Sequence, residues 1–206
     1  LALKITNKSK FAVKPAFILI GGEHAREITT SEIIKRFIST LISQYGTNPD
    51  ITWIIDNQEI WIVPFMDPDG RWIVERATYP PYNGSLPWMW RKNVNRTAAG
   101  SQNCGWPPTG EVSSHAGVDL NRNFDWFWNL GNTDVCNIFY RGQTPSSEPE
   151  TQAVQNLFKS IFNDYKGSNL SDPAATTTKG LLMNIHNTFG SVSWPWGHTS
   201  IYAPNH

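Results

Sequence analysis

The sequence lacks any apolar run long enough to cross a membrane as a helix, and it has no excess of charge of either sign. Its 206 residues include 17 Lys and Arg against 17 Asp and Glu, so the formal net charge is zero. This balance excludes a polycationic protein that binds nucleic acid mainly by neutralising phosphates, and it excludes an acidic disordered tail. Charged residues are only 17% of the chain, whereas hydrophobic residues are 39%, which is enough to form a core.

Cysteine is also scarce, because Cys104 and Cys136 are the only two in the chain. A bridge between them would close a loop of 32 residues and add about 3.5–4 kcal/mol to the free energy of unfolding in the chain-entropy model. Sequons for N-glycosylation begin at four positions: Asn7, Asn83, Asn95 and Asn169. Together these features favour a secreted, extracellular glycoprotein. The N-terminus lacks the basic and apolar regions of a signal peptide, which a mature protein would have lost.

Short apolar runs alternate with a helical pattern along the chain. Between the first two runs, residues 28–42 repeat apolar side chains at helical spacing, and Gly46 follows as a stop. The alternation predicts one α/β domain, built on a mostly parallel mixed sheet with helices on both faces. The three runs that predict its strands are residues 16–20, 59–65 and 180–185.

Polar signals mark the other local features. Asp67-Pro68-Asp69-Gly70 predicts a turn, and Ser147 with Glu150 predicts a capping box before a helix. Residues 77–116 have few periodic apolar side chains and many Pro, Gly, Asn and Ser. So long a stretch without regular structure is usually functional, or is pinned by a link such as the cysteine pair.

One candidate metal site combines a local motif with a distant residue. His24 and Glu27 follow the first predicted strand, and a helical turn would place them on one face, as two ligands of a tetrahedral Zn²⁺ require. His186 ends another strand, and ligands of such sheets gather at the carboxyl ends of the strands. Two His and one Glu leave a metal position open for water. Taken alone, the pair also fits a surface His beside a helix-start Glu, and His186 fits a structural side chain.

A second cluster lies within residues 117–124. Arg122 beside Asn121 can bind a carboxylate through a bidentate fork and one further hydrogen bond, and Asp119 can fix the tautomer of a metal-bound His. The alternative is a turn with a surface ion pair. Arg91 is a further cation in the same loop-rich part of the chain, and by itself it also fits a surface residue.

In combination, these segments resemble the zinc carboxypeptidases, and the whole sequence is similar to their carboxypeptidase A and T branch. Trp194-Pro195-Trp196-Gly197 also looks like a stretch that this branch has after its last zinc ligand. The matching segments, in the order and approximate spacing of the family, are His24-Ala25-Arg26-Glu27, Pro68-Asp69-Gly70, Trp90-Arg91-Lys92, residues 117–123 and His186.

The resemblance implies a carboxypeptidase-like catalytic domain over residues 1–206 that removes C-terminal residues from peptides or proteins with zinc-activated water. It implies one Zn²⁺ held by His24, Glu27 and His186, with Asp119 orienting His24. It implies that Arg91 polarises the scissile carbonyl, that Asn121 and Arg122 clamp the terminal carboxylate, and that Arg26 contacts substrate further from the C-terminus. Cys104 and Cys136 resemble a family disulfide, although Cys104 is displaced upstream.

The sequence departs from the family in its last part. The family has a general-base Glu on a late central strand and a mobile Tyr before it, but no Glu follows Glu150 here. Thr188 stands where the branch usually has Tyr. The resemblance therefore implies a domain that is incomplete at both ends, lacks its C-terminal part, and takes the base and the specificity pocket from an unseen segment or a partner chain.

Two alternatives to the peptidase remain. The chain can be a catalytically inactive carboxypeptidase-like binding or assembly subunit, as the missing base suggests. It can also be a related amide hydrolase that acts on small acylated amino acids. The separation of 162 residues between His24 and His186 favours the peptidase over the amide hydrolase. A nucleic-acid partner has no support in the balanced charge.

Overall fold

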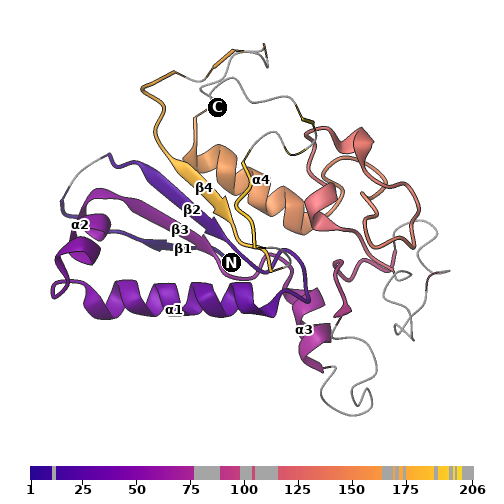
Figure 1. Cartoon of the computed structure of the whole chain (residues 1–206), viewed down its shortest axis with the longest axis horizontal. Helices are drawn as coiled ribbons and strands as arrows, with labels where there is room; N and C mark the ends of the chain where they lie inside the picture. The colour runs from indigo at the N-terminus through magenta and orange to yellow at the C-terminus, as the bar shows by residue number, and fades with distance from the viewer. Residues whose placement is uncertain are drawn as a thin grey trace.

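The computed structural model has a four-stranded sheet with helices packed on both of its faces (Figure 1). The strands are β1 (Leu3–Ile5), β2 (Ala16–Ile20), β3 (Glu59–Val63) and β4 (Leu181–Asn184). The helices are α1 (Ile28–Gln44), α2 (Pro49–Asn57), α3 (Pro68–Arg76) and α4 (Pro149–Ile161), with the 3₁₀ turns η3 (Leu120–Arg122) and η4 (Trp128–Leu130). The described residues are 1–10, 13–76, 89–97, 104, 116–163, 169, 172–173, 175–187, 190–194, 197 and 199–200.

The sheet is mixed and mostly parallel, as predicted. Its strand order is β1-β3-β2-β4, with β2 parallel to both of its neighbours and β1 antiparallel to β3. A three-residue strand has too few alternating side chains to be read from sequence, so β1 was not predicted. The parallel register pairs Ile20 with Val63 on one side and with Asn184 on the other. The carboxyl ends of β2, β3 and β4 therefore meet at one edge of the sheet.

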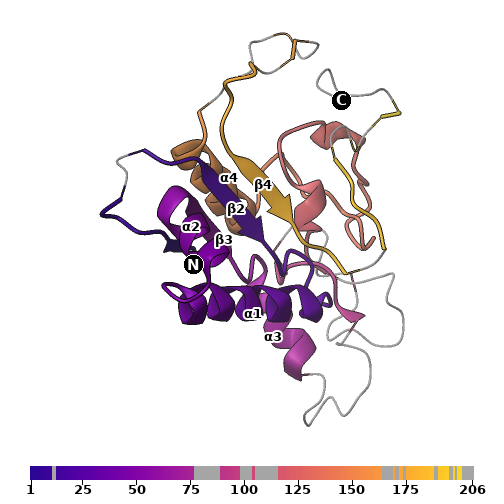
Figure 2. The same ribbon diagram turned by 60° about the vertical axis from the view of Figure 1, so that its left-hand side comes forward.

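The two faces of β2 enter different apolar cores because successive side chains of a strand point to opposite faces. Ile18 and Ile20 pack with Val154 of α4, whereas Leu19 packs with Ile34 and other side chains of α1. Figure 2 shows α1 and α2 on one side of the sheet and α4 on the other. Helices on both faces explain why residues 16–20 are wholly apolar rather than alternating.

β4 differs from the other parallel strands because it lies at the edge of the sheet in the part of the chain that the structure describes. Its side chains Leu181, Leu182 and Met183 are 59%, 40% and 47% exposed, whereas Ile18 in β2 is fully buried.

Among the described residues, no helix is long and apolar enough to cross a membrane.

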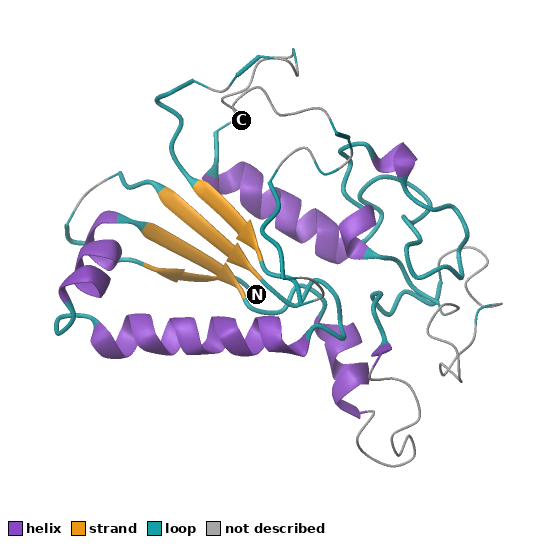
Figure 3. Ribbon diagram, viewed as in Figure 1, coloured by secondary structure: helices purple, strands orange, loops and turns teal. Residues whose placement is uncertain are grey.

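The described residues between α3 and α4, which are 89–97, 104 and 116–148, form a loop half that Figure 3 colours mainly teal. Cys104 and Cys136 form the predicted disulfide there. Polar contacts replace regular structure: the Asn93 side chain accepts from the Val118 amide and donates to Glu148. Most of the predicted loop-rich stretch 77–116 lies outside the described residues.

Two helix starts differ from the sequence prediction. The predicted turn at residues 67–70 is the first turn of α3, where the Asp67 carboxylate accepts from the Gly70 amide and Pro68 occupies the first helical position. Proline fits that position because a first-turn amide has no partner within the helix.

The predicted capping box at Ser147 is wrong. α4 begins at Pro149, its N-cap is Glu148, and no side chain caps it. The Ser147 hydroxyl instead accepts from the Asn123 side chain and donates to Glu148. Tertiary contact with the loop half has therefore replaced the local capping bond.

Candidate metal centre and active site

The candidate metal centre forms where β2 and β4 leave the sheet side by side. Ile20 pairs with Asn184, and the Ile185 amide donates to the Ile20 carbonyl at 2.9 Å. The chain segments that follow these strands therefore start as neighbours, although they are far apart in sequence. The rings of His24 and His186 lie with their centroids 4.9 Å apart.

Two glycines let the chain turn from β2 into this centre. A Cβ atom on Gly21 would stand 2.6 Å from the Ile34 side chain of α1, which is closer than real Cβ contacts allow. Gly22 has a φ of +64°, in the left-handed region that favours glycine. The turn carries His24 and Glu27 to the start of α1, where Glu27 is the N-cap residue.

His24, Glu27 and His186 present their ligand atoms to one another. Glu27 Oε1 lies 2.9 Å from His24 Nδ1, and Glu27 Oε2 lies 3.0 Å from His186 Nδ1. The two Nδ1 atoms are 3.2 Å apart. Two nitrogens and a carboxylate that converge in this way fit the His₂Glu donor set of a catalytic zinc site.

Asp119 holds the other nitrogen of His24. Its Oδ1 lies 3.2 Å from His24 Nε2, and its Oδ2 accepts from Nε and Nη2 of Arg91 at 3.0 and 2.9 Å. A proton on Nε2 leaves the lone pair of Nδ1 available to a metal ion. Burial alone would raise the pKa of Asp119, but the contact with His24 and the charge of Arg91 hold it below its ordinary value.

Glu23 is a site residue that the sequence analysis missed. Its Oε2 lies 3.1 Å from His186 Nε2, and its ligand atom falls close enough to those of His24 and His186 for the three to be a possible metal group. Glu27, the third ligand expected from the sequence, differs from Glu23 in that it contacts Nδ1 of both imidazoles. The signal that the sequence offered for this residue was its position, an acidic residue between Gly21-Gly22 and His24. Its partners lie far along the chain, so the local sequence did not reveal them.

The histidines and carboxylates at the centre stabilise one another's charged forms. Burial alone would raise the pKa of Glu27, but hydrogen bonds from His186 and His24 hold it well below its ordinary value. Burial opposes the charged form of His186, yet Glu23 and Glu27 raise its pKa to about 9. His24 shows the same balance, with burial outweighed by Asp119 and Glu27, so its pKa is also raised.

Three arginines, Arg26, Arg91 and Arg122, lie close to Asp119 or to one another beside the centre. Burial, followed by the charge of Arg91, lowers the pKa of Arg26, so their guanidinium groups interact. Arg91 and Arg122 both lie over the Phe139 ring, at 5.1 and 5.7 Å from its centroid. Arg122 is exposed, and it donates to the Asn121 carbonyl at 2.7 Å. These three arginines, which were predicted to contact substrate, thus form one cationic group, although Arg91 is buried and paired with Asp119.

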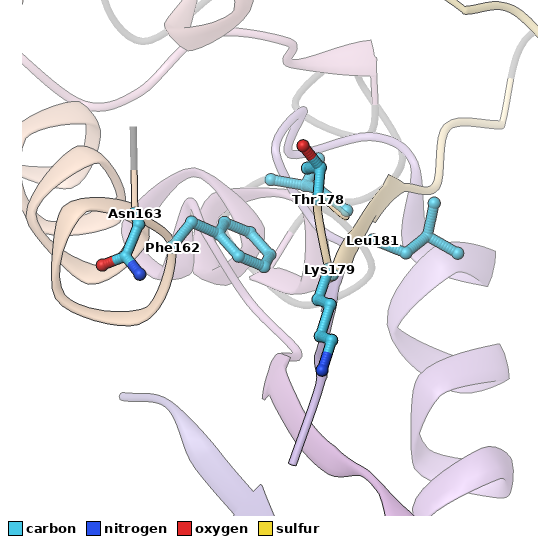
Figure 4. Close-up of a pocket in the computed structure, with 7 residues that line it drawn as sticks. Phe162, Asn163, Thr178, Lys179 and Leu181 are labelled. Carbon is cyan, nitrogen blue, oxygen red and sulfur yellow. The ribbon is translucent and has the colours of Figure 1, made fainter. Parts of the chain in front are cut away.

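A small pocket at the other end of β4 is separate from this centre. It has a volume of about 150 Å³ and is lined by residues from Thr178 to Leu182 together with Phe162 (Figure 4). These residues lie at the amino end of β4, whereas His186 follows its carboxyl end.

Thr188 and residues 195–196 of the Trp-Pro-Trp-Gly segment lie outside the described residues.

Comparison with known proteins gives one consistent family. Human mast cell carboxypeptidase A is 32% identical over 209 residues, which cover 99% of this chain and 40% of that protein. Metallocarboxypeptidase A of Trichophyton rubrum is 32% identical over 154 residues, covering 73% of this chain and 31% of that protein. The chain spans about two-fifths of the length of the mast cell enzymes it matches.

Solved structures agree with this. The thrombin activatable fibrinolysis inhibitor matches with a TM-score of 0.59 and 25% identity, over 77% of this chain and 35% of that one. Carboxypeptidase A of Helicoverpa armigera has the same fold, with a TM-score of 0.62 at 24% identity over 91% of this chain and 37% of that one. The family model described as zinc carboxypeptidase matches residues 1–206. The chain therefore belongs to the zinc carboxypeptidase family.

Proposed function

We propose that this protein removes C-terminal residues from peptides or proteins in a zinc-dependent reaction. The convergence of His24 Nδ1, His186 Nδ1 and the Glu27 carboxylate carries the proposal, since the two nitrogens are 3.2 Å apart and each lies within 3.0 Å of one carboxylate oxygen. When bound there, zinc supplies a Lewis acid that polarises a carbonyl group and makes water more acidic. Asp119 keeps the His24 ring in the tautomer that this site needs.

The cationic group supports a peptide C-terminus as the proposed substrate. Asn121 and Arg122 are adjacent at the 3₁₀ turn η3, so an amide and a guanidinium are available for the two oxygens of a terminal carboxylate. Arg26 extends the same positive region toward substrate residues further from the terminus. We assign Arg91 to the scissile carbonyl, where its charge stabilises the developing oxyanion. Since Asp119 fixes its Nε and Nη2, little reorganisation is needed for this role.

The proposed reaction also needs a general base. The three carboxylates described at the centre are each held by an imidazole: Glu23 by His186, Asp119 by His24 and Glu27 by both. We therefore propose that the base is a Glu from a part of the protein outside this sequence. The exposed apolar edge of β4 is where such a segment, or a partner chain, would add a strand.

Secretion is part of the same proposal. The Cys104–Cys136 disulfide is expected to persist in an oxidising compartment, which favours an extracellular protein. Glycosylation stays a prediction. The side-chain nitrogen of Asn7 donates to Tyr45 and Asp56, and that of Asn95 donates to Glu148, so a glycan at either position would have to displace these contacts.

The test uses full-length, zinc-loaded protein and matched peptides with a free or an amidated C-terminus. The peptides end in aliphatic, aromatic or basic residues. We expect release of the last residue from free C-termini only, and loss of activity with a chelator. Arg122→Ala should lower kcat/KM on free C-termini by about 100-fold, because it removes hydrogen bonds to a charged group. Arg36→Ala, on the exposed side of α1, is the control and should change nothing.

Each described carboxylate at the centre is paired with a histidine rather than placed to act as a general base. This pairing also favours a second candidate, a binding or assembly subunit without catalysis. That protein would bind peptides with a free C-terminus, lose binding on Arg122→Ala, and release no amino acid. Turnover of any of the peptides would exclude it. Absence of both turnover and carboxylate-dependent binding would contradict both candidates.

A further inference from the structure

Glu23 is a buried carboxylate that joins the two strand ends of the metal centre. It is 1% exposed and lies between Gly22 and His24, directly beyond β2. Its Oε2 accepts from the Asn184 side chain at 2.6 Å and lies 3.1 Å from His186 Nε2. Both of these partners come from the other strand end, 161 and 163 residues further along the chain.

The fold alone does not account for a carboxylate at this position. Glu23 Oε1 is buried and has no hydrogen-bond partner among the described residues, and the same is true of Asn184 Oδ1. Burying polar atoms without partners costs stability, and an apolar side chain of similar size would avoid that cost. What the carboxylate provides is its contacts with His186 and Asn184.

The contact uses the nitrogen of His186 that contacts neither His24 nor Glu27 in this structure. His186 Nδ1 contacts Glu27 and lies opposite His24 Nδ1, whereas Nε2 contacts Glu23. Glu23 Oε2 therefore meets two donors, an imidazole N–H and the amide of Asn184. Asp119 stands in the same relation to His24, where it accepts from Nε2 and leaves Nδ1 free for a metal ion.

His186 has more need of such a contact than His24 does. Its side chain is 31% exposed in the described part of the chain, whereas the His24 side chain is 3% exposed. Packing therefore restricts the His186 ring less. A ligand ring that can turn loses affinity for the metal, because its orientation must be fixed on binding.

We propose that Glu23 is the positioning residue of His186: it keeps a proton on Nε2, directs Nδ1 at the metal, and ties the end of β4 to the end of β2 through Asn184. The inference rests on the proposed zinc site and adds a second carboxylate–histidine pair to it. Glu23 acts through His186 and is not itself a ligand of the metal.

The first measurement is zinc affinity, by competition with a chromogenic chelator, on the full-length protein and its Glu23→Gln variant. Glutamine keeps the shape of the side chain and removes its charge. We expect affinity to fall about 10- to 100-fold, the usual effect of removing such a partner. Glu148→Gln is the matched control, since Glu148 is equally buried and accepts from asparagine side chains, but it contacts neither histidine. It should bind zinc as the wild type does.

The second measurement separates positioning from a general loss of structure. In the Co²⁺-substituted protein, NMR should show two shifted exchangeable N–H signals, one from each histidine Nε2. In Glu23→Gln, the His186 signal should exchange faster with water while the His24 signal stays unchanged. A merely structural defect would alter both signals.

The outcomes are distinct. Wild-type affinity in Glu23→Gln, with both signals intact, would overturn the inference and leave the proposed zinc site standing. Loss as complete as in His186→Ala, with a changed Co²⁺ absorption spectrum, would make Glu23 a ligand and also overturn it. A wild-type protein that binds no zinc would overturn the proposed function together with this inference.

Discussion

The sheet half and the loop half of this molecule are held together in different ways. In the sheet half, apolar side chains of β2 and β3 are buried against α1, α2 and α4. In the loop half, a disulfide and buried polar side chains such as Asn93, Lys92 and Asn123 add to small apolar clusters, such as that of Val118 with Tyr140. The metal centre takes His24 and His186 from the first half and Asp119 from the second. Its geometry therefore depends on both apolar packing and polar contacts.

The sheet half gives the largest expected effect. Ile18 is fully buried, and its register partner across the parallel pair, Leu182, is 40% exposed. Ile18→Ala should lower the free energy of unfolding by about 3–4 kcal/mol, because it leaves a cavity between packed layers. Leu182→Ala, the matched control in the next strand, should cost less than about 1 kcal/mol. Urea unfolding of both variants measures the difference. Equal losses would mean that a further segment or a partner packs over Leu182, as the proposed strand addition at β4 allows, and this pair of variants would then no longer distinguish buried from exposed positions.

Asn93 tests the loop half. It is 2% exposed, its Oδ1 accepts from the Val118 amide, and its Nδ2 donates to Glu148. Asn93→Ala should cost about 2 kcal/mol, since it leaves a buried donor and acceptor without partners. Asn57→Ala, which removes an exposed side-chain bond to the Trp53 carbonyl at the end of α2, should cost much less. A negligible loss at Asn93 would show that the disulfide and the small apolar clusters hold this region without its hydrogen bonds.

Lys92 gives the smallest expected effect and depends on pH. Its amine donates to the Val135 and Asn137 carbonyls, and burial lowers its pKa to about 7, against the opposing charges of Asp119 and Asp134. The unfolded chain keeps its proton to a higher pH, near 10.5. Between those values the unfolded state binds more protons, so this group's contribution to stability should rise with pH.

The measurement compares wild type with Lys92→Met. Relative to the variant, the free energy of unfolding of the wild type should rise by about 1 kcal/mol between pH 7 and pH 8. Thermal or urea unfolding at several pH values gives both curves, and the intrinsic cost of the substitution cancels because only the slopes are compared. Parallel curves would show that the buried amine keeps its proton throughout.

The sequence predicted the sheet half better than the loop half, for physical reasons. Residues 16–20 match β2 at both ends because an apolar run is bounded by Lys14-Pro15 and Gly21-Gly22. The helix predicted at 28–42 is α1, two residues longer. α2 was missed although Asn48 caps it and Pro49 starts it, since it has only nine residues.

The site was predicted only where its signals are local or follow from strand ends. The structure brings His24, Glu27, His186 and Asp119 together as the prediction requires, while their roles remain to be tested. Glu23 and the pairing of Arg91 with Asp119 could not be predicted. Both depend on which of several nearby charged groups a side chain meets after folding, and spacing in the sequence does not specify that.

The pairing of Ile20 with Asn184 has one more consequence, for strand sliding. If β4 slipped along β2 by two residues, the same side chains would face each side of the sheet, but His186 would move by about 6.5 Å. That exceeds the 3.2 Å that now separates His186 Nδ1 from His24 Nδ1. A zinc ion bound between the two histidines would therefore favour the present alignment of β4 over its slipped alternatives. Metal binding would in this way fix the register of β4 in the sheet.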